Sequence, residues 1–419
     1  MTIASMVGRL TSETPPVRFE AYDGSSLGPA DSPIVLRLKN ERGLRFLATA
    51  PGDLGAVRAY VSGDLDLEGV HPGDPYAAMK LLGRWRFQRP SPREAAALVR
   101  ELGWRRLLPP EPPPQETLPR WRRVAEGLRH SKRRDAESIT HHYDVSNAFY
   151  EKVLGPSMAY TCAVFPKEDA SLEEAQEEKF DLVARKLGLT AGMRLLDVGC
   201  GWGGMVRHAV KHYGVTAVGV TLSAEQAAWA TAEIERQGLS SHAQVLHRDY
   251  RDSPGGDYDA ISSIGLLEHV GVKQYPQYFR LLHSLLRDGG RLLNHSITRA
   301  HNDTRVVTGD FIDRYVFPDG ELTGSGRIIT AAQDSGFEVR HEENLREHYA
   351  LTLSHWCANL VENWDACVAD VGEPTARIWG LYMAGSRLGF ETNEVQLHQV
   401  LAVKVPPSGD AAYPLRPAW

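Results

Sequence analysis

The chain has 419 residues, of which 42% are hydrophobic and 24% are charged, and it carries a formal net charge of -6. This balance is typical of a folded protein with two or three domains; it excludes a disordered or fibrous chain and argues against a general nucleic-acid-binding protein. No run of eighteen apolar residues occurs, and the opening stretch MTIASMVGRL lacks a signal-peptide pattern. The four cysteines contain no CxxC pair, so we expect a cytoplasmic protein without a disulfide framework or a bound metal.

The amino-terminal part mixes two kinds of pattern. Short alternating apolar runs at residues 34–39 and 44–48 predict strands, and a helical pattern follows near residues 56–61. These patterns predict a small α+β domain over residues 1–108. Six prolines then fall within residues 109–119, and they favour an extended linker because proline cannot continue a helix. Residues 120–419 are left for a second, larger domain.

A basic segment, residues 84–134, spans the predicted linker and carries fourteen Lys or Arg against five Glu. Its first part, RWRFQR from Arg84, interleaves cationic and aromatic side chains, and Lys132, Arg133 and Arg134 form a second cluster. Each such charge contributes about 1 kcal/mol near an anionic membrane surface. The segment therefore predicts peripheral binding at the inner face of a membrane, although a solvated charged surface would have the same composition.

After residue 120 the pattern changes to apolar strands that alternate with amphipathic helices. The strand candidates are residues 193–198, 216–220, 244–246, 258–263, 290–294 and 396–405. This βαβ alternation predicts an α/β fold with a mostly parallel sheet and helices on both faces. Ligands in such folds bind outside the carboxyl ends of the strands.

The strongest local signal is the sequence DVGCGWGG, which directly follows an apolar strand and precedes a helix. Gly199, Gly201 and Gly203 would allow the backbone to approach a ligand closely, and Asp197 adds a carboxylate at the turn. The spacing fits neither a nicotinamide loop nor a Walker loop. It is similar to the DxGxGxG turn of class I methyltransferases, which bind S-adenosylmethionine (SAM). This resemblance implies a Rossmann-like, mostly parallel sheet of seven strands.

One feature departs from that methyltransferase pattern. Most members of the fold end their second strand with an acidic residue that holds the ribose, but here the strand ends in VTLS. Thr221, Leu222 and Gln226 are therefore the candidates for this contact. After the third strand, where the adenine would lie, the candidates are Asp249, Tyr250 and Arg251.

Six motifs in one order make the comparison more specific. They are HYDVSNAFY from His142, AYTCA from Ala159, VTLSAEQ from Val220, RDYRD from Arg248, GLLEHVG from Gly265 and YVFPDG from Tyr315. Together they resemble the cyclopropane-fatty-acyl-phospholipid synthases and the related mycolic acid cyclopropane synthases and methyltransferases, over about the last 280 residues. The first domain resembles, less specifically, the extra amino-terminal domain of the phospholipid enzymes, a lipid-binding or dimerisation type.

The resemblance implies transfer of a methyl group from SAM to a cis double bond in an unsaturated acyl chain of a membrane phospholipid, with a bound bicarbonate ion as the base. It further implies cofactor contacts from Tyr160, Thr161 and Ile264. The resemblance also implies the bicarbonate ligands. They would be Glu268 of GLLEHVG, Cys162 of AYTCA, His295 and the backbone of Ile297 in NHSI from Asn294, and Tyr349 in EHYA from Glu347. Taken singly, each of these has an ordinary reading: Glu268 could cap a helix, His295 could be a core histidine, and Cys162 could be a small buried apolar group.

The product and the partners stay open at this point. A cyclopropane is the first expectation, a methylene-branched chain that a downstream reductase would saturate is the alternative, and a small-molecule C-methyltransferase is a second alternative. A homodimer is implied by resemblance alone. Leu353, Trp356, Leu360, Trp364 and Cys367 recur at helical spacing, and this stripe suits either an acyl channel or plain core. The candidates for stabilising a cation are Phe311, Tyr315 and Phe317.

Overall fold

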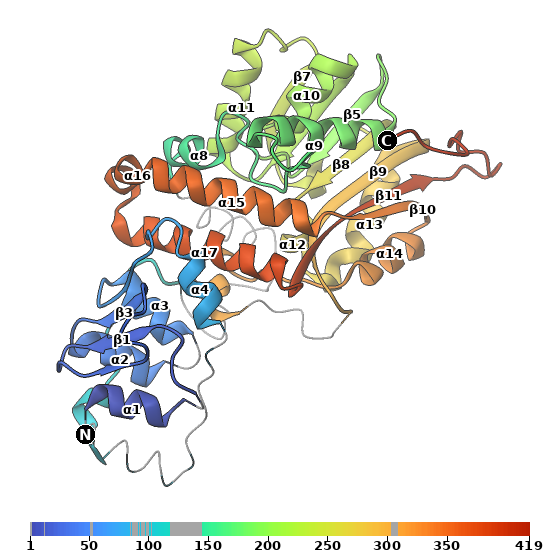
Figure 1. Ribbon diagram of the computed structural model, residues 1–419. Helices are drawn as coiled ribbons and strands as arrows, with labels where there is room; N and C mark the ends of the chain where they lie inside the picture. The colour runs from blue at the N-terminus through green and yellow to red at the C-terminus, as the bar shows by residue number, and fades with distance from the viewer. Residues whose placement is uncertain are drawn as a thin grey trace. The chain divides into compact units, whose positions relative to one another are not determined.

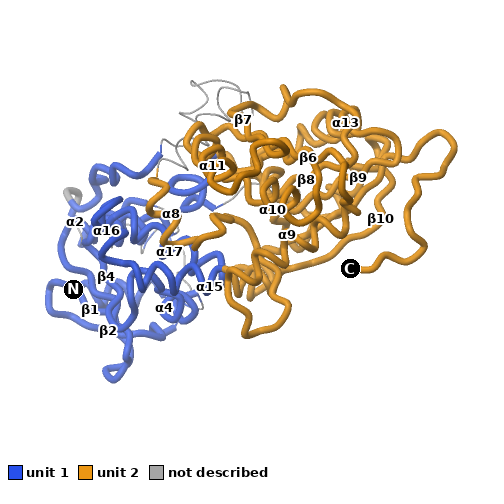
Figure 2. Tube along the Cα trace, turned by 90° about the horizontal axis from the view of Figure 1, so that it is seen from above, with its two compact units in different colours: residues 1–119, 309–318, 353–388 blue, residues 120–308, 319–352, 389–419 orange. Residues whose placement is uncertain are grey.

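The computed structural model (Figure 1) describes residues 2–11, 13–50, 53–83, 103–117, 145–302 and 309–419, with single positions at 85, 91, 93, 97, 100 and 101. It divides into two compact units, each built from separate stretches of sequence (Figure 2). Unit 1 contains Met1–Pro119, Gly309–Pro318 and Leu353–Leu388, and unit 2 contains Arg120–Thr308, Asp319–Thr352 and Gly389–Trp419. The predicted domain boundaries at residues 108 and 119 stay a prediction.

Unit 1 contains a four-stranded sheet in the order β2-β1-β3-β4. Its strands are β1 (Arg18–Ala21), β2 (Ser26–Leu27), β3 (Val35–Leu38) and β4 (Leu65–Glu68). Its helices in this region are α1 (Ile3–Arg9), α2 (Glu41–Thr49), α3 (Leu54–Val61), α4 (Tyr76–Leu82) and the short η1 (Trp104–Leu107). Strands β1 and β3 are parallel and the other pairs are antiparallel, so this unit has the predicted α+β character.

The predicted strand at residues 44–48 is wrong, because these residues lie in helix α2. The side chain of Asn40 accepts a hydrogen bond from the Gly43 N–H at 3.0 Å and so caps the start of the helix. Leu44 and Phe46 are buried in the core of unit 1. A window of five residues is too short to separate the alternating spacing of a strand from the spacing of a helix. The signal in the sequence that favours a helix here is Asn40, the capping residue.

Glu116 links the proline-rich segment to other parts of unit 1. Its carboxylate, with a side chain only 2% exposed, accepts two hydrogen bonds from Arg58 at 2.6 and 2.7 Å, one from Arg314 at 2.6 Å and one from the Tyr315 hydroxyl at 3.0 Å. Arg314 and Tyr315 belong to η5 (Ile312–Val316), a π-helical turn. The carboxylate therefore joins three distant stretches of unit 1. Unit 1 also contains α16 (Trp364–Val371) and most of α17 (Glu373–Glu391).

Unit 2 contains a seven-stranded sheet in the order β10-β11-β9-β8-β5-β6-β7. The strands are β5 (Arg194–Val198), β6 (Thr216–Thr221), β7 (Ala243–His247), β8 (Tyr258–Ile264), β9 (Leu286–Arg299), β10 (Phe337–Asn344) and β11 (Val395–Lys404). Pairs β5–β6, β6–β7, β5–β8 and β8–β9 are parallel, whereas β11 is antiparallel to both β9 and β10. The predicted mostly parallel, seven-stranded α/β fold is confirmed.

Strand β10 was not among the six strands that the sequence indicated. Its sequence, FEVRHEEN, lacks a continuous apolar run. Only Phe337 is buried, and the residues after it alternate between exposed and partly buried. Because it lies at the sheet edge and pairs only with β11, one face of it stays in contact with solvent.

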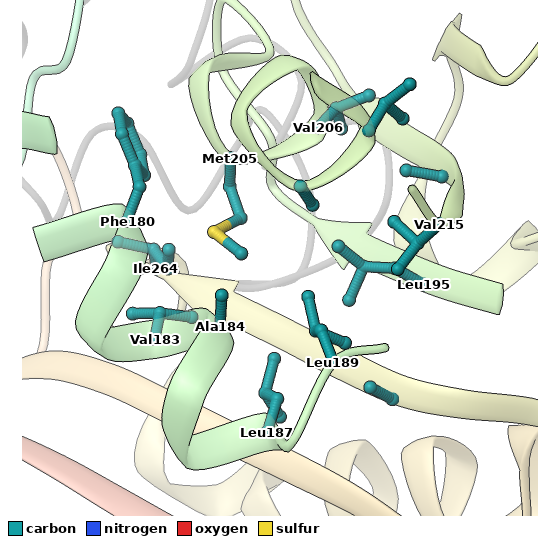
Figure 3. Packing of buried hydrophobic residues seen from close by; sticks show 14 of the residues in the cluster. Phe180, Val183, Ala184, Leu187, Leu189, Leu195, Met205, Val206, Val215 and Ile264 are labelled. Atoms are coloured by element: carbon teal, nitrogen blue, oxygen red, sulfur yellow. The ribbon is translucent and has the colours of Figure 1, made fainter. Parts of the chain in front are cut away.

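Helices cover both faces of the large sheet. One face carries α9 (Leu172–Leu187), α10 (Gly204–Tyr213) and α11 (Ala224–Arg236); the other carries α12 (Leu267–Val270), α13 (Tyr275–Leu285) and α14 (Ser325–Asp334). Neighbouring residues of β5 point to opposite faces, so Leu195 packs with α9 and α10 while Leu196 packs with α13. Figure 3 shows Val183 and Ala184 of α9 gathered with Met205 of α10. We call the first face the α9 face.

The remaining elements of unit 2 are short or peripheral. They are α8 (Asn147–Leu154), η3 (Tyr250–Asp252), η4 (Val272–Gln274) and the first part of α15 (Arg346–Glu362). Among the helices that the structure describes, none combines the length and the apolar character needed to cross a bilayer.

Candidate active site

The glycine-rich turn lies at the carboxyl end of β5, at the centre of the sheet. Gly199, Gly201 and Gly203 have φ values of +73°, +53° and +73°, a backbone region that strongly favours glycine. The N–H groups of Gly199 and Cys200 both donate to the Val220 carbonyl, at 2.9 and 3.0 Å. This geometry explains why the sequence has glycine here, and it bends the backbone so that α10 begins directly after the turn.

A pocket opens beside this turn. Seven of the residues predicted to contact the cofactor line it: Tyr160, Thr161, Asp197, Gly199, Gly201, Gln226 and Ile264. They come from the segment before α9, the ends of β5 and β8, and the start of α11. The structure therefore brings together residues from four separate stretches of sequence at the expected edge of the sheet.

The other predicted cofactor residues lie outside the lining of this pocket. Thr221 donates a hydrogen bond to Gln226 Oε1 at 2.8 Å, so it orients a lining residue. The Leu222 carbonyl contacts His247 Nε2 at 3.0 Å, and Gly203 precedes the lining residue Gly204.

The predicted adenine-contacting residues form a small ion-paired group. The Asp249 carboxylate pairs with the Arg251 guanidinium at 2.6 Å and also accepts the Arg251 N–H at 2.8 Å. The Arg251 guanidinium lies 5.3 Å from the centre of the Tyr250 ring. Contacts of these three residues with an adenine ring stay a prediction.

Lys179 is a pocket-lining residue that the sequence interpretation missed. Its side chain is fully buried, and Nζ donates to Thr161 Oγ1 at 2.9 Å and lies 3.8 Å from the centre of the Phe180 ring. Burial lowers the pKa of Lys179 to about 7, which the nearby Cys162 thiol and Asp197 carboxyl oppose. A lysine within the polar sequence AQEEKFD looks like a surface charge, so no signal in the sequence distinguished it.

Asp197 is buried beside this lysine. Its Oδ1 accepts a hydrogen bond from the Ser262 hydroxyl at 2.6 Å. Burial raises the pKa of Asp197 to about 7, and the Ser262 hydrogen bond and the Lys179 charge counteract that rise. The pocket therefore contains an acid and a base that both titrate near neutral pH.

A second polar group lies next to the pocket wall, where helix α12 meets strand β9. Glu268, in the first turn of α12, accepts the Ile297 N–H through Oε1 at 2.6 Å. Among the described residues its Oε2 is buried and has no hydrogen-bond partner, and burial raises the pKa of Glu268 to about 7. The Ile297 N–H that was predicted to contact an ion is thus already bonded to Glu268.

His295 lies two residues before Ile297, and both side chains therefore project from the same face of β9. It is 1% exposed, and its Nδ1 is 3.2 Å from Gln399 Nε2. Within the described part of the chain its Nε2 is buried and has no partner. Burial, with the charges of Lys179 and Lys186, lowers the pKa of His295 well below its usual range, so the ring is neutral. The Gly265 N–H donates to the His295 carbonyl at 2.8 Å, and Gly265 lines the pocket.

Cys162 and Tyr349 meet at one backbone carbonyl. The Leu345 carbonyl accepts the Cys162 thiol at 3.7 Å and the Tyr349 N–H at 3.2 Å. The Tyr349 ring packs 4.5 Å from the Phe390 ring, centre to centre. Burial raises the pKa of the Cys162 thiol, so the geometry favours a protonated, buried cysteine over a nucleophile.

The apolar stripe of the later helices lies in unit 1. Leu353, Trp356, Leu360 and Cys367 are at most 1% exposed, as expected for plain core. Tyr315 bonds to Glu116, and Phe317 packs 5.7 Å from Tyr382, ring centre to ring centre. Roles of these residues toward an acyl chain stay predictions.

Comparison with known proteins shows which family the chain belongs to. A family model described as mycolic acid cyclopropane synthetase matches residues 130–400, more than half of the chain. The chain belongs to this family. The resemblance found in the motifs is therefore confirmed, and the protein is a SAM-dependent methyltransferase with a class I fold.

Individual relatives agree with the family. The chain is 62% identical over 405 residues to a probable fatty acid methyltransferase of Mycobacterium tuberculosis, covering 96% of this chain and 95% of the relative. It is 35% identical over 260 residues to the cyclopropane-fatty-acyl-phospholipid synthase of Escherichia coli, covering 62% and 66%. Among solved structures, mycolic acid cyclopropane synthase CmaA1 in complex with S-adenosylhomocysteine (SAH) matches with a TM-score of 0.61 and 34% identity, over 64% of this chain and 98% of that chain.

Gly201→Val provides a test of the cofactor pocket. Gly201 has φ +53° and lines the pocket, so a valine there combines backbone strain with a side chain at the cofactor site. We expect the dissociation constant for SAM, measured by calorimetry, to rise at least about tenfold, which is about 1.4 kcal/mol. Gly238→Val is the matched control, because Gly238 has φ +70°, is exposed and lies away from the pocket. Equal weakening of SAM binding in both variants would refute the assignment.

Proposed function

We propose that this protein transfers a methyl group from SAM to the cis double bond of an unsaturated fatty acyl chain of a membrane phospholipid, and that the product is a cyclopropane fatty acyl chain. The observation that carries the proposal is the buried pair of Glu268 Oε2 and His295 Nε2, which lack partners among the described residues beside the cofactor pocket. Such a pair fits a reaction that needs a base held away from water.

The chemistry explains why a base is needed. An alkene is a weak nucleophile, and SAM supplies a strongly electrophilic methyl group when it is bound. Methyl addition leaves a positive charge on the acyl chain, which must then lose a proton. Asp197, Gln226 and the glycine turn would hold the donor, while Glu268 and His295 would hold the proton acceptor.

Bicarbonate fits the two atoms without partners. A neutral His295 that carries its proton on Nε2 donates a hydrogen bond, and an ionised Glu268 Oε2 accepts one. Bicarbonate presents oxygen acceptors together with one hydroxyl donor, so a single ion satisfies both atoms. As the base, the ion would take the proton that the acyl chain loses.

A methylene-branched product is the second candidate. Two relatives that match 96% of the chain are named probable fatty acid methyltransferases, whereas the cyclopropane-fatty-acyl-phospholipid synthase of Escherichia coli matches 62% of it. Proton loss after a hydride shift would leave a methylene group, and a separate reductase would then be needed for a saturated methyl branch. Both routes use the same donor and the same base.

Membrane binding through the basic segment and formation of a homodimer are further parts of the proposal. Long acyl chains reside in bilayers, so the enzyme must reach a membrane surface. Of the aromatic and cationic cluster RWRFQR, the structure describes Trp85, and the rest of the cluster and Lys132, Arg133 and Arg134 lie outside the described residues. The proposal for this segment therefore rests on its composition.

Glu268→Gln and His295→Ala test the base site. We expect each variant to lose turnover of unsaturated phospholipid by about 100-fold or more, because general base catalysis contributes roughly 10² to 10⁴-fold. SAM affinity should stay near that of the wild type, since neither side chain lines the cofactor pocket. A lipid assay and calorimetry on the same samples measure both. Glu235→Gln, at an exposed position of α11, is the control, and normal turnover in Glu268→Gln would refute the proposal.

The product is identified by proton NMR of the extracted fatty esters. Ring protons of a cyclopropane lie upfield and vinylidene protons lie downfield, whereas mass alone cannot separate the two isomers. We expect the upfield ring signals. A clean vinylidene signal would replace the first candidate by the second, and a saturated methyl branch formed without a reductant would contradict the mechanism.

The basic segment is tested with vesicles. Replacing Arg84, Arg86 and Arg89 by Gln should reduce sedimentation with anionic vesicles, most strongly at low salt, because exposed charges are screened over roughly 10 Å at 0.1 M salt. The control replaces three exposed cations of unit 2 by Gln, namely Lys211, Arg280 and Arg416. Equal loss of binding in both triple variants, or binding to neutral vesicles that matches binding to anionic ones, would leave the segment a solvated surface.

A further inference from the structure

We propose that Lys186 and Gln399 are positioning residues that hold the neutral His295 ring with its proton on Nε2, facing the base site. Neither residue contacts the cofactor pocket, and the sequence interpretation did not select either. The catalytic consequence of this arrangement rests on the proposed function, whereas the arrangement itself can be measured without any substrate.

The three antiparallel strands place these groups in one row. Gln399 of β11 lies directly opposite His295 of β9, and Glu343 of β10 lies directly opposite Gln399. Directly opposed residues project from the same face of a sheet and approach each other closely. Lys186 of α9 reaches this row from above the sheet, with a side chain that is fully buried.

Lys186 fixes the orientation of the Gln399 amide. Its ammonium group forms an ion pair with Glu343 and donates to Gln399 Oε1 at 2.6 Å. An ammonium group has donors and no acceptor, so the side of the amide that faces it must be the oxygen. The Gln399 NH2 group is thereby turned toward His295.

The amide in turn fixes the histidine tautomer. Gln399 Nε2 lies 3.2 Å from His295 Nδ1, and an amide NH2 group can only donate. Nδ1 must therefore carry the lone pair. In a neutral ring the proton then sits on Nε2, the buried atom that has no partner within the described residues.

The position of the proton on the His295 ring affects how the ring can interact with a bound anion. An Nε2–H group attracts an oxygen of a bound anion, whereas the opposite tautomer would turn a lone pair toward it. The partly buried ion pair of Lys186 with Glu343, acting through the Gln399 amide, thus leaves a defined hydrogen-bond donor at His295 Nε2. A purely structural role would require only that Lys186 and Gln399 satisfy each other, with no effect of Gln399 on the ring.

The first test reads the tautomer in the wild-type protein. ¹⁵N NMR of histidine-labelled protein separates the two neutral tautomers, and the His295 signal is assigned as the one missing from a His295→Asn sample. We expect the Nε2–H form, persisting at pH values at which exposed histidines are protonated. An Nδ1–H form, or a charged ring at neutral pH, would overturn the inference.

The second test uses the variant Gln399→Glu, which replaces the amide donor that faces His295 by a carboxylate acceptor. One carboxylate oxygen would stay with Lys186, and the other would accept from Nδ1–H, which moves the ring proton away from Nε2. We expect the ¹⁵N signals to change to the opposite tautomer and kcat to fall about 10- to 100-fold, as is usual when the partner of a functional histidine is replaced. The KM for SAM should change less than twofold.

Gln396→Glu is the matched control, since it makes the same chemical change on the same strand at a side chain that bonds to Asn393 near the surface. A Gln399→Glu protein in which the His295 tautomer or kcat is unchanged would overturn the inference. If that variant fails to fold, the tautomer of His295 in the wild-type protein still tests the inference. Wild-type protein that shows the Nε2–H form but does not methylate lipid would contradict the proposed function and leave the histidine arrangement standing.

Discussion

Glu268 Oε2 and His295 Nε2 are among the buried polar atoms that have no hydrogen-bond partner within the described residues, and the need to satisfy them is the constraint on which the proposed base site depends. Leaving such a group unpaired costs about 1 to 3 kcal/mol each, which a folded protein rarely sustains without a reason. A small ion that both accepts and donates would remove this cost. The unsatisfied pair therefore supports the proposed binding site for the base.

Helix α9 connects this pair to the cofactor pocket. Its apolar side chains, including Val183 and Ala184, pack against the sheet, and the same helix carries two fully buried lysines. Lys179 lines the pocket beside Asp197, and Lys186 lies behind His295, two helical turns or about 10 Å further along the axis. One helix thus supplies packing on the α9 face, a buried lysine in the lining of the pocket and the lysine that donates to Gln399 beside His295.

The sequence revealed the parts of this site that depend on local geometry. The glycine turn requires positive φ at three positions, so its composition alone predicted the cofactor edge of the sheet. Glu268 and His295 were found through motifs. Lys179, Lys186 and Gln399 were not, because charged residues in polar helical sequence are usually exposed, and a glutamine in the last strand gains its role only from a cross-strand partner. Likewise, the pairing of Asp249 with Arg251 depends on a turn that spacing does not determine.

The most direct measurement is a high-resolution crystal structure of the protein with SAH in the cofactor pocket. The account predicts density for one planar ion with three oxygen atoms, within hydrogen-bond distance of both Glu268 Oε2 and His295 Nε2. Density in which Glu268 turns to bond directly with His295, or in which both atoms are satisfied by other groups of the protein, would contradict it.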